Sequence, residues 1–78
     1  MSVATNIKTI RQMQGMSQQD LADIIGVTQS YISIYESGMR TPGNETLQKI
    51  AGGLGVSVEL LKAETLKVTA KAIKAKKD

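Results

Sequence analysis

The chain contains no cysteine and no histidine, and two tyrosines are its only aromatic residues. Without cysteine there is no disulfide and no thiolate metal site. Without histidine, the commonest general base and the commonest zinc ligand are both missing. The carboxylates are scattered along the sequence and form no convergent pair. We therefore expect neither an enzyme nor a protein that holds a metal or another cofactor.

Long apolar runs are also missing, because no more than two consecutive residues are apolar. A membrane-spanning helix needs about 20 apolar residues, and the core of a signal peptide needs about 7–15. We therefore expect no membrane segment and a cytoplasmic protein. Apolar residues still make up 41% of the 78 residues, and charged residues make up 22%. This composition is typical of one small globular domain.

The basic residues are unevenly distributed. Residues 1–64 carry five basic and six acidic side chains, whereas residues 65–78 carry five lysines and one aspartate. The net charge of +3 therefore comes from the C-terminal segment. This contrast divides the chain into a predicted domain, residues 1–64, and a Lys-rich tail, residues 65–78.

The tail has three interpretations. It is a solvated, disordered end, or a segment that supports dimerisation, or a source of phosphate contacts. Dimerisation would use apolar residues at helical spacing, which are Leu66, Ala70 and Ile73.

Capping residues and glycines predict five short helices. The predicted N-caps are Ser2, Ser17, Thr28, Asn44 and Ser57. Glycine, which readily adopts the left-handed conformation that ends a helix, follows the first four segments, at Gly15, Gly26, Gly38 and Gly55. Apolar residues recur at intervals of three or four, and no segment alternates as a strand does. The expected fold is all-α.

Two further local patterns concern the second and fourth predicted helices. Ser17 and Asp20 have the spacing of a capping box, in which each side chain bonds the backbone N–H of the other residue. In the fourth helix, Gly52 and Gly53 are expected to weaken the last turn by roughly 1 kcal/mol each relative to alanine.

Residues 17–38 form the most informative segment, because two short helices are expected to meet there at a tight turn. Ala22 is small enough for the helices to approach closely, and Gly26 permits the positive φ of the turn. The apolar seam between the helices comprises Leu21, Ile25, Val27, Ile32 and Tyr35. This is the helix-turn-helix pattern, whose second helix lies in the major groove of DNA.

From about Ile7 to Leu61 the chain resembles the Cro/repressor-type (Xre-like) helix-turn-helix regulators. The resemblance is carried by IRQMQGMSQQDLADIIGVTQSYISIYESGMRTP and by ETLQKIAGGLGVSVELL. It implies a compact five-helix, lambda-repressor-like DNA-binding domain, followed by a basic tail that is partly helical or disordered. The chain departs from the family at Ile24 and Met39, which are apolar where relatives usually carry polar or basic side chains.

Four outward positions of the second helix of the motif are predicted base contacts: Gln29, Ser30, Ser33 and Ile34. Glutamine can bond an adenine edge with two hydrogen bonds, serine can donate or accept, and isoleucine can contact a thymine methyl. The resemblance implies the same four positions. The alternative is an ordinary solvated face, with Ile34 as an isolated exposed apolar residue.

Residues at both ends of the motif are predicted to contact the phosphate backbone. The amides of Ser17 and Gln18 lie at a helix N-terminus, where phosphate binds readily. The resemblance also gives Gln18 a role in supporting the first residue of the recognition helix. Tyr31 is predicted either to pack or to contact a phosphate. The resemblance also implies backbone contacts around the turn after the recognition helix, at Ser37, Met39, Arg40 and Asn44. Arg40 and Lys8 are the cations available to phosphate in this part of the chain.

Arg11 and Glu36 would count for little as two separate surface charges. The resemblance pairs them as an ion pair between the first and third helices. Its implied role is structural, because it orients the recognition helix.

Together these observations predict a sequence-specific transcriptional regulator, acting as a repressor and encoded by a prokaryote or phage. It is expected to bind a palindromic operator in double-stranded DNA as a homodimer, with recognition helix 28–37 in the major groove and no small-molecule effector. The alternative is a protein-interaction module of the same fold, such as an antitoxin or adaptor, whose partner would contact Ile24, Met39 and the tail.

Overall fold

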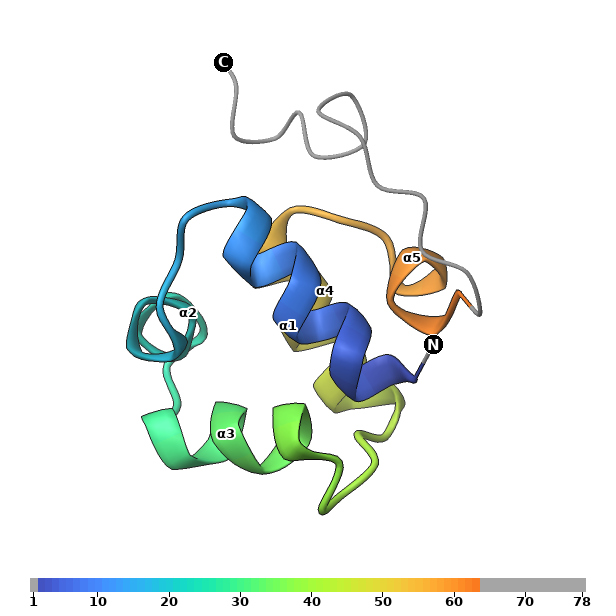
Figure 1. Cartoon of the computed structure of the whole chain (residues 1–78), viewed down its shortest axis with the longest axis horizontal. Helices are drawn as coiled ribbons and strands as arrows, with labels where there is room; N and C mark the ends of the chain where they lie inside the picture. Colours follow the sequence, from blue (N-terminus) through green and yellow to red (C-terminus); the bar gives the residue numbers. More distant parts are fainter. Residues whose placement is uncertain (1, 64–78) are drawn as a thin grey trace.

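The computed structural model describes residues 2–63, which form five helices and no strand. These are α1 (Val3–Met13), α2 (Gln18–Ile25), α3 (Gln29–Ser37), α4 (Asn44–Leu54) and α5 (Val58–Lys62). The predicted all-α, five-helix fold is confirmed over this range (Figure 1). The tail, with Leu66, Ala70 and Ile73, lies outside the described residues, so its three interpretations remain predictions.

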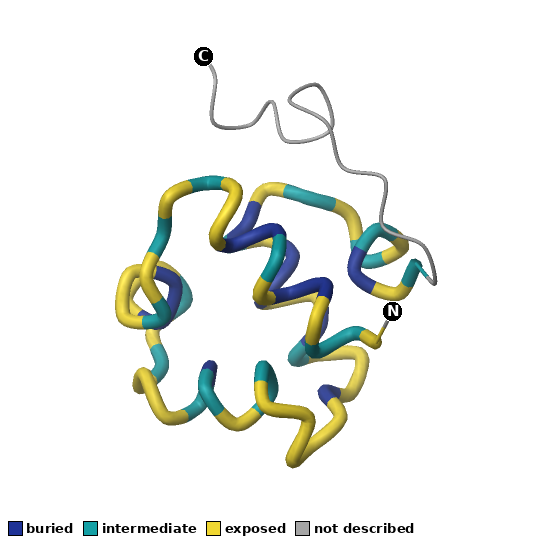
Figure 2. Tube along the Cα trace, in the orientation of Figure 1, coloured by how far each residue is buried: buried dark blue, intermediate teal, exposed yellow. Residues whose placement is uncertain are grey.

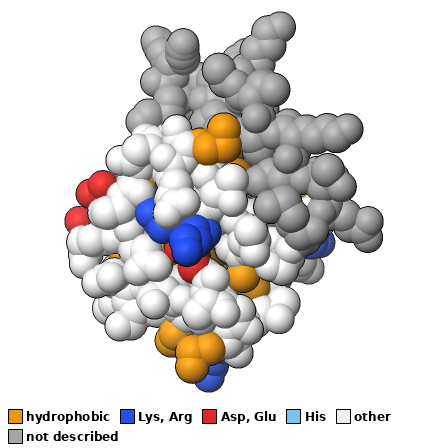
Figure 3. Space-filling view, in the orientation of Figure 1, with side chains coloured by type: hydrophobic (Ala, Val, Ile, Leu, Met, Phe, Trp, Pro, Cys, Tyr) orange, Lys and Arg blue, Asp and Glu red, His pale blue; other side chains and the backbone are white. Residues whose placement is uncertain are grey.

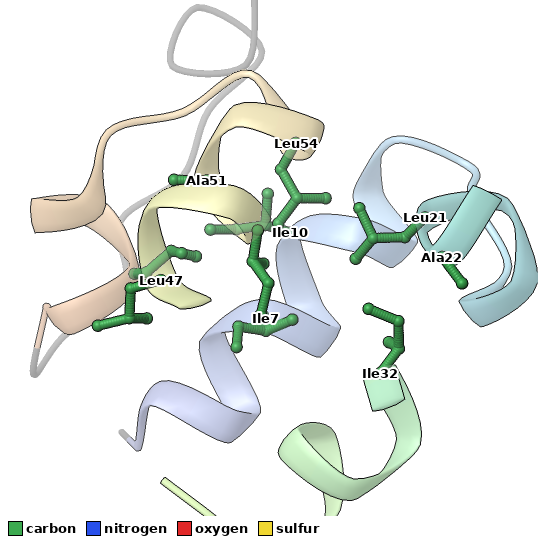
Figure 4. Close-up of a cluster of buried hydrophobic side chains, with 10 residues drawn as sticks. Ile7, Ile10, Leu21, Ala22, Ile32, Leu47, Ala51 and Leu54 are labelled. Carbon is green, nitrogen blue, oxygen red and sulfur yellow. The ribbon is translucent and has the colours of Figure 1, made fainter. Parts of the chain in front are cut away.

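The helices are arranged around α1. It crosses α4, with α2 and α5 at opposite sides and α3 along the lower edge in the view of Figure 1. Both α2 and α1 pack against α3, and α5 packs against α1 and α4. In Figure 4, Ile7 and Ile10 of α1 lie between Leu21 and Ile32 of the motif on one side and the side chains of α4 on the other. The recognition segment is therefore attached to the same apolar core as the rest of the domain.

Helix starts follow the predicted caps with one exception. The side chains of Ser2, Ser17, Thr28 and Ser57 each accept a hydrogen bond from the backbone N–H three residues later. The predicted cap at Asn44 is wrong. The chain is still extended at Gly43, which is the N-cap of α4 without any side-chain hydrogen bond, and it is already helical at Asn44.

Helix ends also agree with the sequence. The four glycines predicted to stop helices, Gly15, Gly26, Gly38 and Gly55, all have positive φ. No non-glycine residue among the described ones has this conformation, so the turns of the domain depend on these positions.

Gly53 has a role that the sequence did not reveal. A Cβ atom on Gly53 would lie 2.5 Å from Cγ2 of Ile25 and 3.0 Å from Cδ1 of Leu21, both on α2. Nothing lies within 4 Å of the corresponding position on Gly52. Gly53 therefore permits the close approach of α4 to α2, whereas Gly52 only lowers the helix propensity.

Asn6 joins the two ends of the domain. Its side chain is fully buried, and Nδ2 donates to the carbonyl oxygens of Leu61 and Ala63, each at 2.8 Å. These two bonds connect the C-terminal end of α5 to the first half of α1. Within the described residues, no helix is long and apolar enough to span a membrane.

Candidate nucleic-acid interface

The turn between α2 and α3 is closed by backbone hydrogen bonds to one residue. Gly26 is left-handed at φ 77°, and its N–H donates to the carbonyl of Ala22. The N–H of Val27 donates to the same carbonyl at 2.9 Å. Thr28 then begins α3 by accepting from the N–H of Tyr31. Ala22 is completely buried. Its small side chain lies where α2 and α3 meet, as the sequence predicts.

Ile32 is the apolar residue of α3 that is completely buried. Gln29, Ser30 and Ile34 are exposed, and Ser33 is half-buried on the same side of the helix. Figure 2 shows this helix at the edge of the molecule, largely in the colours of exposed and intermediate residues. The four predicted base contacts therefore share the outward side of α3.

Arg11 and Glu36 form an ion pair between α1 and α3. Arg11 Nε donates to Glu36 Oε2 at 2.6 Å, and Arg11 Nη2 donates to Oε1 at 3.0 Å. Only 7% of the arginine side chain and 3% of the glutamate side chain are exposed. Arg11 also donates to the carbonyl of Met16. Such a two-bonded, desolvated pair fixes the position of α3 far more firmly than a surface pair would.

Two glutamines extend this pair to the surface. Gln18 Nε2 donates to Glu36 Oε1 at 3.1 Å, and Gln29 Nε2 donates to Gln18 Oε1 at 3.1 Å. A continuous chain of side-chain hydrogen bonds therefore runs from Arg11 in the interior to Gln29 at the exposed start of α3. The first residue of the recognition helix is held by α2.

A hollow of about 180 Å³ adjoins this chain of hydrogen bonds. It is lined by Lys8 from α1, Gln18 from α2 and three residues of α3, which are Ser33, Glu36 and Ser37. Lys8 is exposed, so it supplies a cation on the same side as the predicted base contacts. In the view of Figure 3, Lys and Arg side chains are few on the coloured surface.

The N-terminus of α2 differs from the prediction in one respect. The N–H of Ser17 donates to Asp20 Oδ2 at 2.9 Å, and the N–H of Asp20 donates to Ser17 Oγ at 2.9 Å. The predicted capping box is confirmed. The same bond engages the Ser17 amide, which in this structure donates to Asp20 and not to the phosphate that the sequence interpretation assigned to it.

The capping box leaves a negative charge at this helix end. The hydrogen bond from the Ser17 backbone, followed by that with its side chain, lowers the pKa of the Asp20 carboxyl below its usual range. A carboxylate here interacts favourably with the helix dipole. It also repels a phosphate, so the side chain of Gln18 is better placed for a phosphate contact than the Ser17 amide.

The turn after α3 contains several predicted backbone contacts. Ser37 Oγ donates to the carbonyl of Ile34 at 2.8 Å and accepts from the N–H of Met39, so Ser37 stabilises the turn. Met39 is 79% exposed, and Arg40 and Asn44 are exposed as well. This turn forms the lower tip of the molecule in Figure 1.

Tyr31 takes part in packing. Its ring meets that of Tyr35 edge to face with centroids 5.2 Å apart, and its hydroxyl donates to Thr46 Oγ1 at 3.4 Å. The residue thereby links α3 to α4.

Ile24 of α2 is 56% exposed. This exposure is expected, because relatives usually carry a polar or basic side chain at this position. Among the described residues, no cluster of acidic side chains is placed to hold a metal ion.

Comparison with known sequences identifies the family. The profile of a family described as helix-turn-helix matches residues 7–61. An uncharacterized HTH-type transcriptional regulator of Sinorhizobium fredii is 38% identical over 60 residues, which cover 76% of this chain and 78% of that protein. One from Bacillus subtilis is 39% identical over 61 residues, or 77% of this chain and 53% of that protein. The immunity repressor protein of Bacillus phage phi105 is 33% identical over 64 residues, or 82% of this chain and 44% of that protein. The chain thus spans about half the length of the Bacillus subtilis and phage phi105 relatives.

Solved structures agree with this assignment. The P22 c2 repressor, in complex with a synthetic operator, superposes with a TM-score of 0.75 at 23% identity, over 83% of this chain and 98% of that one. SinR, a master regulator for biofilm formation solved in complex with DNA, superposes with a TM-score of 0.71 at 37% identity, over 76% of this chain and 95% of that one. The predicted lambda-repressor-like fold is therefore confirmed, and the chain belongs to the helix-turn-helix family of transcriptional regulators of the Xre and lambda-repressor type.

Proposed function

We propose that the chain is a sequence-specific DNA-binding transcriptional repressor whose helix α3 enters the major groove. The observation that carries the proposal is the outward side of α3, where Gln29, Ser30, Ser33 and Ile34 lie together while Ile32 anchors the helix to the core. Residues 1–64 form the DNA-binding domain, and residues 17–38 its helix-turn-helix.

Each base-contacting residue has a distinct chemistry. Gln29 provides a hydrogen-bond donor and an acceptor to an adenine edge, and the two serines donate or accept. Ile34, 36% exposed, provides an apolar contact for a thymine methyl group. An isoleucine exposed to water in the free protein would bury apolar surface against the thymine methyl group in the complex.

Backbone contacts flank this reading surface. Gln18 at the start of α2 and Arg40 after α3 contact phosphates, together with Lys8 beside the hollow. The remaining backbone contacts are the Ser17 hydroxyl, Tyr31, Ser37, Met39 and Asn44. Because the described part of the chain offers few cations on this side, we expect modest affinity for random DNA and a correspondingly larger share of affinity from base contacts.

The operator is palindromic and the protein binds it as a homodimer. One nine-residue recognition helix reaches only a few base pairs. A two-fold pair of such helices doubles the number of bases read and requires a matching symmetry in the DNA. We propose that the protein is encoded by a prokaryote or phage and is associated with DNA in the cytoplasm. We expect no small-molecule effector.

The test is selection of DNA from a random pool by the purified full chain, followed by affinity measurements on the enriched sequence. Gln29→Ala should lose about 1–3 kcal/mol on that sequence and little on random DNA. Gln48→Ala, at an exposed glutamine of α4, is the control and should bind as the parent does. Failure to enrich any sequence, or equal losses on both DNAs, would contradict the proposal and favour a protein partner at Ile24 and Met39. Light scattering of the complex tests the dimer.

A further inference from the structure

The chain of hydrogen bonds from Glu36 to Gln29 has a fixed direction. A glutamine amide can in general present either its nitrogen or its oxygen to a neighbour. Glu36 removes that freedom, because a carboxylate only accepts. Gln18 must therefore turn Nε2 toward Glu36, which leaves Oε1 for Gln29, and Gln29 must turn Nε2 toward Gln18. The direction set at Glu36 passes through two side chains to the surface.

Glu36 is well placed to set this direction. Arg11 donates to both of its carboxylate oxygens, and Gln18 donates to one of them, so both oxygens act as acceptors. With 3% of its side chain exposed, Glu36 is shielded from solvent, so water does not compete strongly for these positions. It lies behind Gln18 and does not itself belong to the exposed face of α3.

We propose that Glu36, without touching DNA, determines which base Gln29 prefers. The inference rests on the proposed function, in which α3 reads base edges. With one N–H engaged by Gln18, Gln29 has one N–H and its Oε1 left for the groove. Adenine offers one acceptor and one donor, which match this pair, whereas guanine offers two acceptors. Against guanine, Oε1 of Gln29 meets an acceptor, and the fixed direction prevents the amide from turning its nitrogen there.

A purely structural role for Glu36 makes a different prediction. If the glutamate only holds α3 in place, its loss lowers the affinity for all sequences by a similar factor. If it sets the direction of the amides, its loss lowers the preference for adenine over guanine. The deciding quantity is therefore the ratio of the two affinities at the base read by Gln29.

The experiment uses the full chain and two DNA duplexes, the selected operator and the same operator with guanine in place of adenine at the position read by Gln29. That position is the one at which Gln29→Ala removes the base preference. The parent should prefer adenine roughly 5- to 100-fold. Glu36→Gln, whose side chain can offer either atom to Gln18, should reduce this preference to about twofold or less. Circular dichroism spectra of the variant and the parent are compared first, to test whether the variant is folded.

A second variant avoids the buried ion pair. Gln18→Met removes the connecting amide and leaves Arg11 and Glu36 paired, so it should lose the preference as well. Gln19→Met, at the exposed neighbouring glutamine, should keep it. The inference is overturned if folded Glu36→Gln and Gln18→Met both retain the parent ratio, or if the preferred base is guanine. If Gln29→Ala changes no base preference, the base assignment in the proposed function fails, and the inference fails with it.

Discussion

The Cγ2 methyl group of Ile25 fills the space into which a side chain on Gly53 would project, at 2.5 Å from the position of its Cβ. Cγ2 is attached directly to the branched Cβ of isoleucine, so it cannot move away without a change of rotamer or of backbone. The distance between α2 and α4 is therefore set by the missing side chain of Gly53.

Two adjacent glycines should consequently respond to alanine in opposite ways. We expect Gly53→Ala to lower the free energy of unfolding by about 1–3 kcal/mol, because the added methyl overpacks the contact with α2. Gly52→Ala meets nothing within 4 Å, so it should raise the free energy of unfolding by up to about 1 kcal/mol through helix propensity alone. Urea unfolding of both variants measures the difference. Equal stabilisation by the two substitutions would show that α2 and α4 are not closely packed at this point.

The Arg11–Glu36 pair should behave as one unit. Arg11→Met and Glu36→Gln are each expected to lower the free energy of unfolding by about 3–5 kcal/mol, because each leaves a buried group without its charged partner. The double variant should cost less than the sum of the two. A double-mutant cycle in thermal or urea unfolding measures the coupling energy. Strict additivity would mean that the two side chains do not interact in solution.

Asn6 should tolerate no exchange of its amide for a carboxyl. Asn6→Asp keeps the shape of the side chain but turns acceptor oxygens toward the carbonyls of Leu61 and Ala63. We expect a loss of about 3 kcal/mol or more in the free energy of unfolding at neutral pH, since two hydrogen bonds are lost and a charge is buried. Gln12→Glu makes the same chemical change at an exposed position of α1 and should cost little. Similar losses for the two variants would contradict the role of Asn6.

The capping box should give stability a dependence on acidic pH. Because the native pKa of Asp20 is lowered, its contribution is fully present above the unfolded-state pKa and is lost as the pH falls through the native one. The stability advantage of the parent over Asp20→Asn should thus be constant near neutrality and shrink below about pH 4. Unfolding curves of both proteins from pH 7 to pH 3 measure it. An advantage that grows on acidification would contradict the assignment.

Local features of this chain were predictable because their causes are local. Ser17 and Asp20 are three residues apart, and each left-handed glycine lies within two residues of the end of its helix. Neighbouring residues of similar capping ability were harder to separate: both Gly43 and Asn44 suit an N-cap, and only the backbone at Gly43 decides between them.

Contacts between distant parts of the chain carried no such signal. Gly53 meets Ile25 across 28 positions, and Asn6 meets Leu61 across 55. Neither periodicity nor composition distinguishes Gly53 from Gly52, or a buried asparagine from a solvated one. The Ser17 amide shows a further difficulty, since one N–H was assigned both to a cap and to a phosphate, and only geometry shows that the cap has taken it.

The attachment of α3 through Ile32 has a consequence for how such proteins diverge. Four positions of this helix are exposed, Gln29, Ser30, Ile34 and Ser37, so substitutions there leave the apolar core unchanged. Evolution or protein design can therefore replace the outward-facing residues and change the preferred DNA sequence while the five-helix fold is kept. Exchanging this helix face between relatives, while Ile32 is retained, is a route to regulators that ignore one another's operators.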